Sequence, residues 1–146
     1  MVAVHIPCKL HVKKYLIGRY GPFHTMSKKS LLGTLLFHVL DKNCQKAAIQ
    51  LENYTEKYDI MIPEFYFKTK GYNIGYKKQH YLAVCFDKIF FEDLLQSIEI
   101  GVSQYNAKPI DAIRRFLKKY NITENDVNFD SIYRQYQREK KQKISV

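Results

Sequence analysis

The sequence predicts an α+β protein that is mainly helical, with a small β element packed with helices around one long central helix. Three observations predict this class. Apolar residues between Tyr76 and Ile100 cover most of a helical circumference, residues 2–6 and 57–62 alternate as half-buried strands do, and several capped amphipathic segments suit helices. The 146 residues fit one domain that buries about two thirds of its unfolded surface. We expect residues 1–107 to form its helical core and residues 108–143 a basic, helix-turn-helix-like segment of the same domain.

The central helix is the predicted hub of the fold. A helix that is apolar nearly all round has to be enclosed by other elements or by another copy of itself. The stretch therefore predicts either a helix wrapped by its own chain or a homodimer, whose two-fold symmetry would suit a palindromic DNA site. The apolar residues behind this expectation are Tyr81, Leu82, Val84, Cys85, Phe86, Ile89, Phe90, Phe91, Leu94, Leu95, Ile98 and Ile100.

The first segment predicts a strand followed by a helix. Residues 2–6 alternate apolar side chains with Ala and His, which suits a short half-buried strand. Pro7 can occupy the first helical position, where its missing N–H costs nothing, and the helix continues through Lys9–Tyr20. Gly21 supplies a left-handed cap and Pro22 cannot continue the helix, so it ends there.

A second helix and further strand signals follow. Ser27 is a candidate N-cap for a helix with leucines at helical spacing up to Leu40, and Asn43 ends it. Residues 49–51 and 58–62 both alternate, and they predict either a hairpin or strands added to residues 2–6. A turn or two of helix is expected at Glu64–Lys70, and Asn73–Gly75 is expected to separate it from the long helix.

Two helices close the chain. Pro109 opens the first, Thr123 can cap a single turn through Val127, and Asn128 can cap the last helix. Apolar residues at helical spacing give each helix an inner face. These residues are Ile110, Ile113, Phe116, Leu117 and Tyr120 in the first helix, and Phe129, Ile132, Tyr133 and Tyr136 in the second.

The charge lies at the two ends. Residues 1–30 contain six basic groups and no acid, residues 31–107 contain eight basic and nine acidic groups, and residues 108–146 contain ten basic and five acidic groups. A bias towards Lys in a low-GC genome is one explanation for the net charge of +10. Four of the five arginines, however, fall in the last 33 residues, and arginine is favoured where phosphate or guanine is contacted through two hydrogen bonds.

The strongest functional candidate is the last pair of helices. Two amphipathic helices joined by a short capped turn are the layout of a DNA-reading helix-turn-helix, in which the second helix enters the major groove. A pair of helices with solvated basic surfaces is the competing interpretation. Carboxylates at Glu124, Asp126 and Asp130 would move the contact surface towards Arg134, if they serve the positive helix ends. The candidate DNA-binding residues are Arg114, Arg115, Lys118 and Lys119 on the first helix, and Arg134, Gln137, Arg138 and Lys141 on the second.

The segment Ala112–Arg138 resembles the C-terminal part of small uncharacterised proteins carried by bacterial prophages and conjugative elements. The resemblance covers under a quarter of the chain. It implies a mobile-element setting and a DNA-associated role such as transcription regulation, and it transfers no catalytic motif. The residues that carry it are Phe116, Lys119, Tyr120, Ile122, Asp126, Tyr136 and Arg138.

Three other binding interpretations remain open. The N-terminal order of strand, helix and helix matches a ribbon-helix-helix unit, although Ala3 and His5 are poor base readers. A protein–protein adaptor that uses the central helix or Leu31–Leu40, without nucleic acid, is the alternative from another class. Tyrosines interleaved with lysines, which would stack unpaired bases, suggest a site for single strands. These are Tyr66, Tyr72, Tyr76 and Tyr81, with Lys68, Lys70, Lys77 and Lys78.

We expect neither an enzyme nor a cofactor or metal site. The five histidines are scattered and none stands in HExxH or at metal-ligand spacing from a cysteine. Cys8, Cys44 and Cys85 form no CxxC and suit reduced, mostly buried thiols. No apolar run reaches the length of a membrane span and no secretory signal is apparent, so a cytoplasmic protein without membrane contact is expected.

Overall fold

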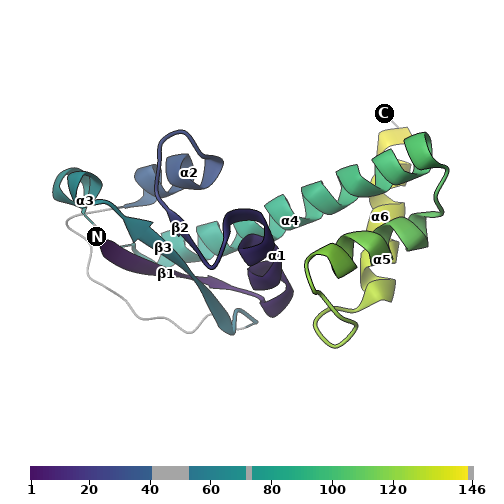
Figure 1. Cartoon of the computed structure of the whole chain (residues 1–146), viewed down its shortest axis with the longest axis horizontal. Helices are drawn as coiled ribbons and strands as arrows, with labels where there is room; N and C mark the ends of the chain where they lie inside the picture. The colour runs from purple at the N-terminus through teal and green to yellow at the C-terminus, as the bar shows by residue number, and fades with distance from the viewer. Residues whose placement is uncertain (41–52, 72–73, 145–146) are drawn as a thin grey trace. The chain divides into compact units, whose positions relative to one another are not determined.

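The computed structural model describes residues 1–40, 53–71 and 74–144 and confirms a mainly helical α+β fold with a small sheet and a long central helix. The chain consists of two compact units, Met1–Lys88 and Ile89–Val146, and the border between them lies inside that helix (Figure 1). The ranges 1–107 and 108–143 expected from the sequence place their border later. The elements are β1 (Val2–Cys8), α1 (Leu10–Tyr20), β2 (Phe23–Thr25), α2 (Leu31–Val39), β3 (Glu56–Ile62), α3 (Glu64–Lys70), α4 (Tyr76–Tyr105), α5 (Pro109–Lys119) and α6 (Phe129–Ile144).

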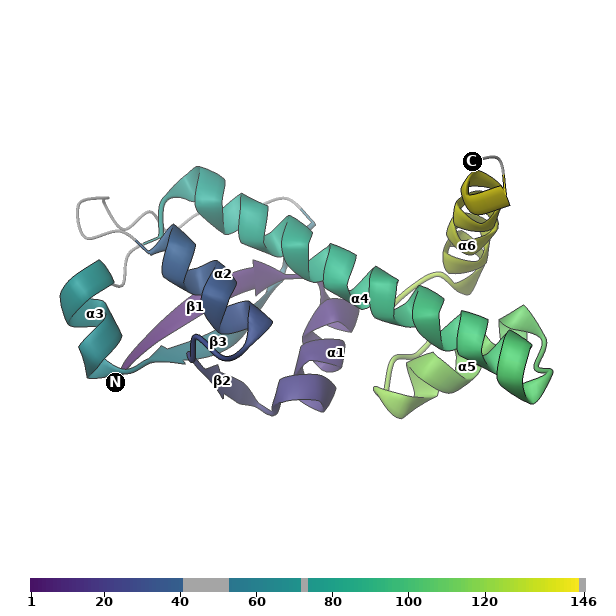
Figure 2. The same cartoon turned by 90° about the horizontal axis from the view of Figure 1, so that it is seen from above.

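The first unit is built on a three-stranded sheet in the order β1-β3-β2. β1 pairs with β3 antiparallel and β2 pairs with β3 parallel. Ile6, Tyr58 and Ile60 are fully buried on one face, whereas His5 and Asp59 lie exposed on the other. α2 and the first part of α4 cross over the strands (Figure 2). The alternation of residues 2–6 and 57–62 was therefore a correct signal of a one-sided sheet.

Local chemistry shifts several boundaries from their predicted positions. Pro7 belongs to β1 rather than to a helix, and α1 begins at Leu10 with Lys9 as its N-cap. The N-cap of α2 is Ser30, whose hydroxyl accepts a hydrogen bond from the Gly33 N–H at 2.9 Å. Ser27, the predicted cap, instead accepts from the N–H of Lys29.

Two further predictions fall on the central part of the chain. β3 pairs with β1, so residues 58–62 add a strand to residues 2–6, which is one of the two predicted alternatives. Asn43, residues 49–51 and Asn73 lie outside the described residues. Strand β2, only three residues long, was not expected.

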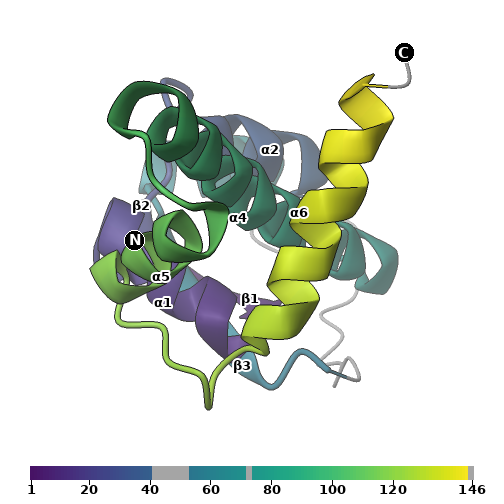
Figure 3. The same cartoon turned by 90° about the vertical axis from the view of Figure 1, so that its right-hand side faces the viewer.

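The second unit consists of α5 and α6 packed on the C-terminal part of α4 (Figure 3). The rings of Phe90 and Phe116 meet with centroids 5.8 Å apart, and Leu94 and Ile98 are fully buried. α4 continues past Gly101, where a Cβ would stand 3.2 Å from the Cβ of Ala112. The glycine therefore permits close packing of α5 instead of ending the helix near Ile100 as predicted.

Only one stripe of α4 is fully covered. Five large buried residues recur every four positions along the helix, with Ala83 and Gly101 buried beside them, whereas Tyr81, Ile100 and Tyr105 are 54%, 40% and 70% exposed. The expectation that the helix is enclosed on nearly all sides was therefore too broad. The large residues of the buried stripe are Leu82, Phe86, Phe90, Leu94 and Ile98.

Within residues 1–40, 53–71 and 74–144, no helix combines the length and the apolar character that are needed to cross a lipid bilayer.

Candidate nucleic-acid interface

The connection between α5 and α6 is a short, hydrogen-bonded turn. α5 ends at Lys119, and Asn121 adopts a left-handed conformation with φ of 58°. The Asp126 carboxylate accepts hydrogen bonds from the backbone N–H and the hydroxyl of Thr123, at 2.9 and 3.1 Å. Asn128 caps α6 as predicted, because its side-chain oxygen accepts from the N–H of Ser131 at 3.1 Å. The turn is therefore held by side chains at both ends.

α5 separates its apolar and basic residues cleanly. Ala112, Ile113, Phe116 and Leu117 are buried, and the four predicted cations of this helix are exposed. At about 100° per residue, those cations share one continuous outer face. The face comprises Arg114, Arg115, Lys118 and Lys119, with Asp111 as its acidic residue.

α6 repeats this arrangement. Ile132 and Tyr136 are buried, whereas all four residues predicted to contact DNA are exposed on the side opposite to them. The described part of the chain offers no ion pair to Arg134 or Arg138. The predicted contact residues of this helix, Arg134, Gln137, Arg138 and Lys141, therefore lie on one outer face.

Acidic groups gather at the turn end of this interface. Arg114 borders a depression of about 530 Å³ together with Glu124, Asp126 and Asp130. Asp130 also stands in the first turn of α6, where a carboxylate is stabilised by the helix dipole. These carboxylates lie before the first arginine of α6, so the exposed basic residues of this helix begin at Arg134.

The two units differ in net charge. The first unit contains fourteen Lys and Arg and six Asp and Glu, a net charge of +8, whereas the second contains ten and eight, a net charge of +2. Between Arg134 and Lys143, however, five basic residues accompany a single acid, Glu139. The second unit thus has strongly basic surface only where its charges separate along the helices.

Several cations of the first unit are engaged within it. Lys9 pairs with Asp87 at 3.4 Å and Lys13 with Glu56 at 3.9 Å. The Lys28 ammonium lies 4.2 Å from the centroid of the Phe37 ring. These lysines stabilise the fold locally, so they contribute less to a ligand surface than the charge count indicates.

The alternative nucleic-acid sites fare differently. β2 interrupts the expected order of strand, helix and helix, and β1 pairs with β3 of its own chain, so the ribbon-helix-helix layout is not formed. His5 is also engaged, because its ring hydrogen-bonds with Asp59.

Of the tyrosines proposed to bind single-stranded nucleic acid, Tyr81 is exposed and the Tyr66 ring lies against Phe37 and Phe65. Tyr72 lies outside the described residues.

A polar network around Asp87 was not foreseen. Its Oδ2 accepts a hydrogen bond from the Tyr54 hydroxyl at 2.9 Å and lies near Lys9, while its buried Oδ1 meets no donor among the described residues. Burial, and then the hydrogen bond with Asp87, raise the pKa of Tyr54 to about 12. The ring of Tyr54 meets that of His80 edge-on. These residues are far apart in sequence, so no local motif predicts the network, and it joins the segment before β3 to the first part of α4.

Cys8 is fully buried, and burial raises the pKa of its thiol to about 12, which disfavours the reactive thiolate. Within residues 1–40, 53–71 and 74–144, His, Cys, Asp and Glu side chains form no group of three that would hold a metal ion.

Comparison with protein-family models, with curated proteins and with solved structures finds no match to this chain.

Proposed function

We propose that this protein binds nucleic acid, double-stranded DNA in preference to RNA, through the outer faces of α5 and α6, and that it performs no catalysis. One observation carries the proposal. Two helices within one compact unit, joined by a capped turn, bury their apolar faces and present a row of cations on their outer faces. The preference for DNA follows from shape, because an α-helix fits the major groove of B-DNA, whereas that of A-form RNA is deep and narrow.

The acidic residues at the turn define how the helix would meet DNA. A helix inserted by its first turn would bring Asp130 close to phosphate, and like charges repel. We therefore place the contact from Arg134 onwards, with α5 alongside the phosphate backbone. Contacts of this kind position the protein and carry little sequence information by themselves.

The biological setting is part of the same proposal. The resemblance of the C-terminal segment supports a regulator or accessory factor of a mobile genetic element, of the prophage or conjugative kind, which would act in the cytoplasm. That setting rests on the resemblance alone.

The test is fluorescence anisotropy of a labelled duplex of about 20 base pairs with the variant Arg134→Ala/Arg138→Ala. Losing two charged contacts to phosphate is expected to weaken binding by about tenfold or more. The matched control Lys77→Ala/Lys78→Ala removes two exposed cations from the first unit. If the affinity falls equally in both variants, the basic residues of α6 do not form the specific contact with DNA.

A protein–protein adaptor is the second candidate, and the apolar end of α4 favours it. Ile100, Val102 and Tyr105 are 40%, 36% and 70% exposed there, whereas the apolar face of α2 is largely buried in its own unit. The adaptor would therefore use the end of α4 rather than Leu31–Leu40. Elution from a heparin column with the void would favour the adaptor, and retention at moderate salt would favour the nucleic-acid binder.

Homodimerisation is a separate part of the proposal. The part of α4 around Tyr81, which is 54% exposed in the first unit, is the surface that would serve it. Light scattering at two protein concentrations tests this expectation.

A further inference from the structure

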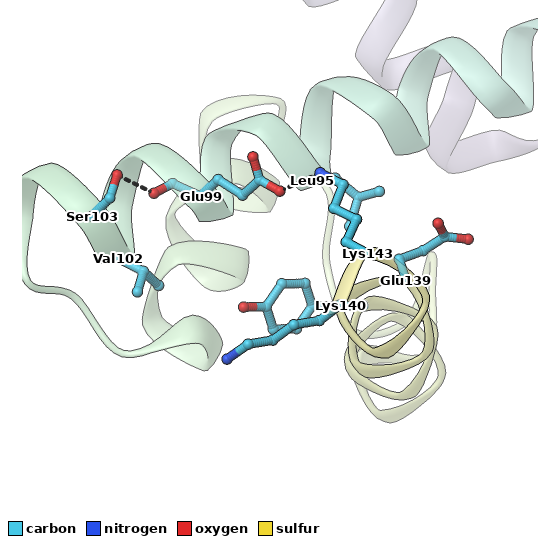
Figure 4. A pocket seen from close by; sticks show the side chains of 8 residues that line it. Leu95, Glu99, Val102, Ser103, Glu139, Lys140 and Lys143 are labelled. Carbon is cyan, nitrogen blue, oxygen red and sulfur yellow. Dashed lines mark hydrogen bonds and ion pairs between the residues drawn. The ribbon is translucent and has the colours of Figure 1, made fainter. Parts of the chain in front are cut away.

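A cavity of about 370 Å³ lies between the C-terminal part of α4 and the inner side of α6, within the second unit (Figure 4). Leu95, Val102 and Tyr136 give it an apolar lining. Small-molecule sites are typically of this kind, mostly apolar concavities with a few polar groups that orient the ligand. The polar residues of this cavity are Glu99, Ser103, Glu139, Lys140 and Lys143.

Most of these polar groups already have partners. Glu99 and Lys143 form an ion pair at 2.5 Å, and the Ser103 hydroxyl donates to the backbone oxygen of Glu99 at 2.6 Å. The hydrogen bond with Glu99 raises the pKa of Lys143, so this lysine stays charged and engaged. Figure 4 shows the Glu139 carboxylate turned away from the cavity.

Lys140 differs from its neighbours. Its side chain extends from α6 along the cavity (Figure 4), and the described part of the chain supplies no carboxylate within ion-pair distance of its ammonium. Among the described residues, the lining therefore combines an apolar wall with the paired Glu99 and Lys143, the Glu139 carboxylate that is turned away, and the exposed Lys140 ammonium, which has no ion-pair partner. A single negative charge matches this cation, whereas a phosphate dianion would need further donors.

The volume of the cavity indicates how much of a ligand it can hold. At roughly 30 Å³ for each water-sized group, the volume holds about a dozen non-hydrogen atoms. We propose that this cavity binds an aliphatic carboxylate of about ten to twelve non-hydrogen atoms, with the carboxylate on Lys140 and the chain against Leu95, Val102 and Tyr136.

The site is also placed to regulate the proposed function, and this step rests on that function. Arg134 and Arg138 lie on the outer face of the helix whose inner face lines the cavity. A bound carboxylate adds a negative charge to the basic half of α6, so it is expected to weaken the attraction of this helix for phosphate. By linkage, bound DNA would weaken carboxylate binding by the same factor.

The experiment is a titration of the full chain with decanoate in the absence of DNA, followed by amide chemical shifts. A ligand of this size is expected to bind with a dissociation constant of roughly 1 mM or tighter. Decanol, which keeps the chain and lacks the charge, is expected to bind at least about fivefold more weakly. Shifted amides are expected along residues 95–103 and 136–143.

Variants assign the site. Lys140→Ala is expected to weaken decanoate binding at least fivefold, and Val102→Trp, which fills the cavity, to abolish it. Lys108→Ala, an exposed lysine outside the cavity, is the matched control and is expected to bind as the parent does. Equal binding of decanoate and decanol, or equal affinities of Lys140→Ala and Lys108→Ala, would overturn the proposal. Because no DNA is present, this result is independent of the failure or success of the proposed function.

Discussion

Replacing Gly33 by Ala gives the sharpest test of how the first unit is packed. A Cβ at this position would stand 1.8 Å from the backbone oxygen of Ser27, a separation at which atoms overlap severely. That oxygen also accepts hydrogen bonds from the N–H and the hydroxyl of Ser30, both at 3.1 Å. The segment at Ser27 would have to move by more than an ångström, and the two bonds would weaken or break.

The expected magnitude follows from these contacts. Overpacking costs about 1–3 kcal/mol, and two lost hydrogen bonds add about 1 kcal/mol each. The better helix propensity of Ala returns about 1 kcal/mol. We therefore expect Gly33→Ala to lower the free energy of unfolding by about 2–4 kcal/mol, a large part of the stability of a small unit.

The assay is urea unfolding followed by circular dichroism. Gly75→Ala is the matched control, because a Cβ there would meet no atom within 4 Å; as Gly75 precedes α4 at its N-cap, this change is expected to cost no more than about 1 kcal/mol. Propensity alone predicts the opposite sign for Gly33→Ala. A stabilised Gly33→Ala protein would therefore refute the close approach of Ser27.

Three further predictions concern single side chains. The Cys8 thiol, with its pKa raised to about 12, is expected to stay unreactive towards a thiol reagent at pH 8 until urea unfolds the protein, and rapid labelling that Cys8→Ser abolishes would contradict this. Burial lowers the pKa of His24 below 6.5, so the unfolded chain binds the proton more readily and stability falls as the pH falls from about 6.5 through the lower folded pKa. His24→Gln should flatten this dependence between pH 8 and pH 5, and an unaltered dependence would count against it. Asn128→Ala removes the cap of α6 and should cost about 1 kcal/mol with faster amide exchange in its first turn, whereas Asn125→Ala in the same loop should change neither.

The sequence predicted those elements whose signals are local. Pro109 and Asn128 mark the starts of α5 and α6, and the alternation of residues 57–62 marks a strand with one buried face. The sequence did not predict features that depend on contacts between residues far apart in the chain. At Gly101, inside α4, Ala112 of α5 approaches closely, and the short β2 is defined by its pairing with β3.

The candidate interface divides in the same way. The exposure of Arg134 and Arg138 followed from helical spacing alone, because the apolar residues fix the inner face. The cavity on that inner face was not predicted, since it depends on how α6 packs against α4. Lys140 and Val102 belong to different elements, and no spacing within either helix places them together.

The salt dependence of duplex binding tests the central claim most directly. The observed association constant of the full chain is measured by anisotropy between about 50 and 200 mM salt, and its logarithm is plotted against that of the salt concentration. Contact with about six phosphates predicts a slope near −5, and the Arg134→Ala/Arg138→Ala variant, with two fewer contacts, a slope near −3.5. A slope near zero, or the same slope for both proteins, would contradict binding through the basic face of α6.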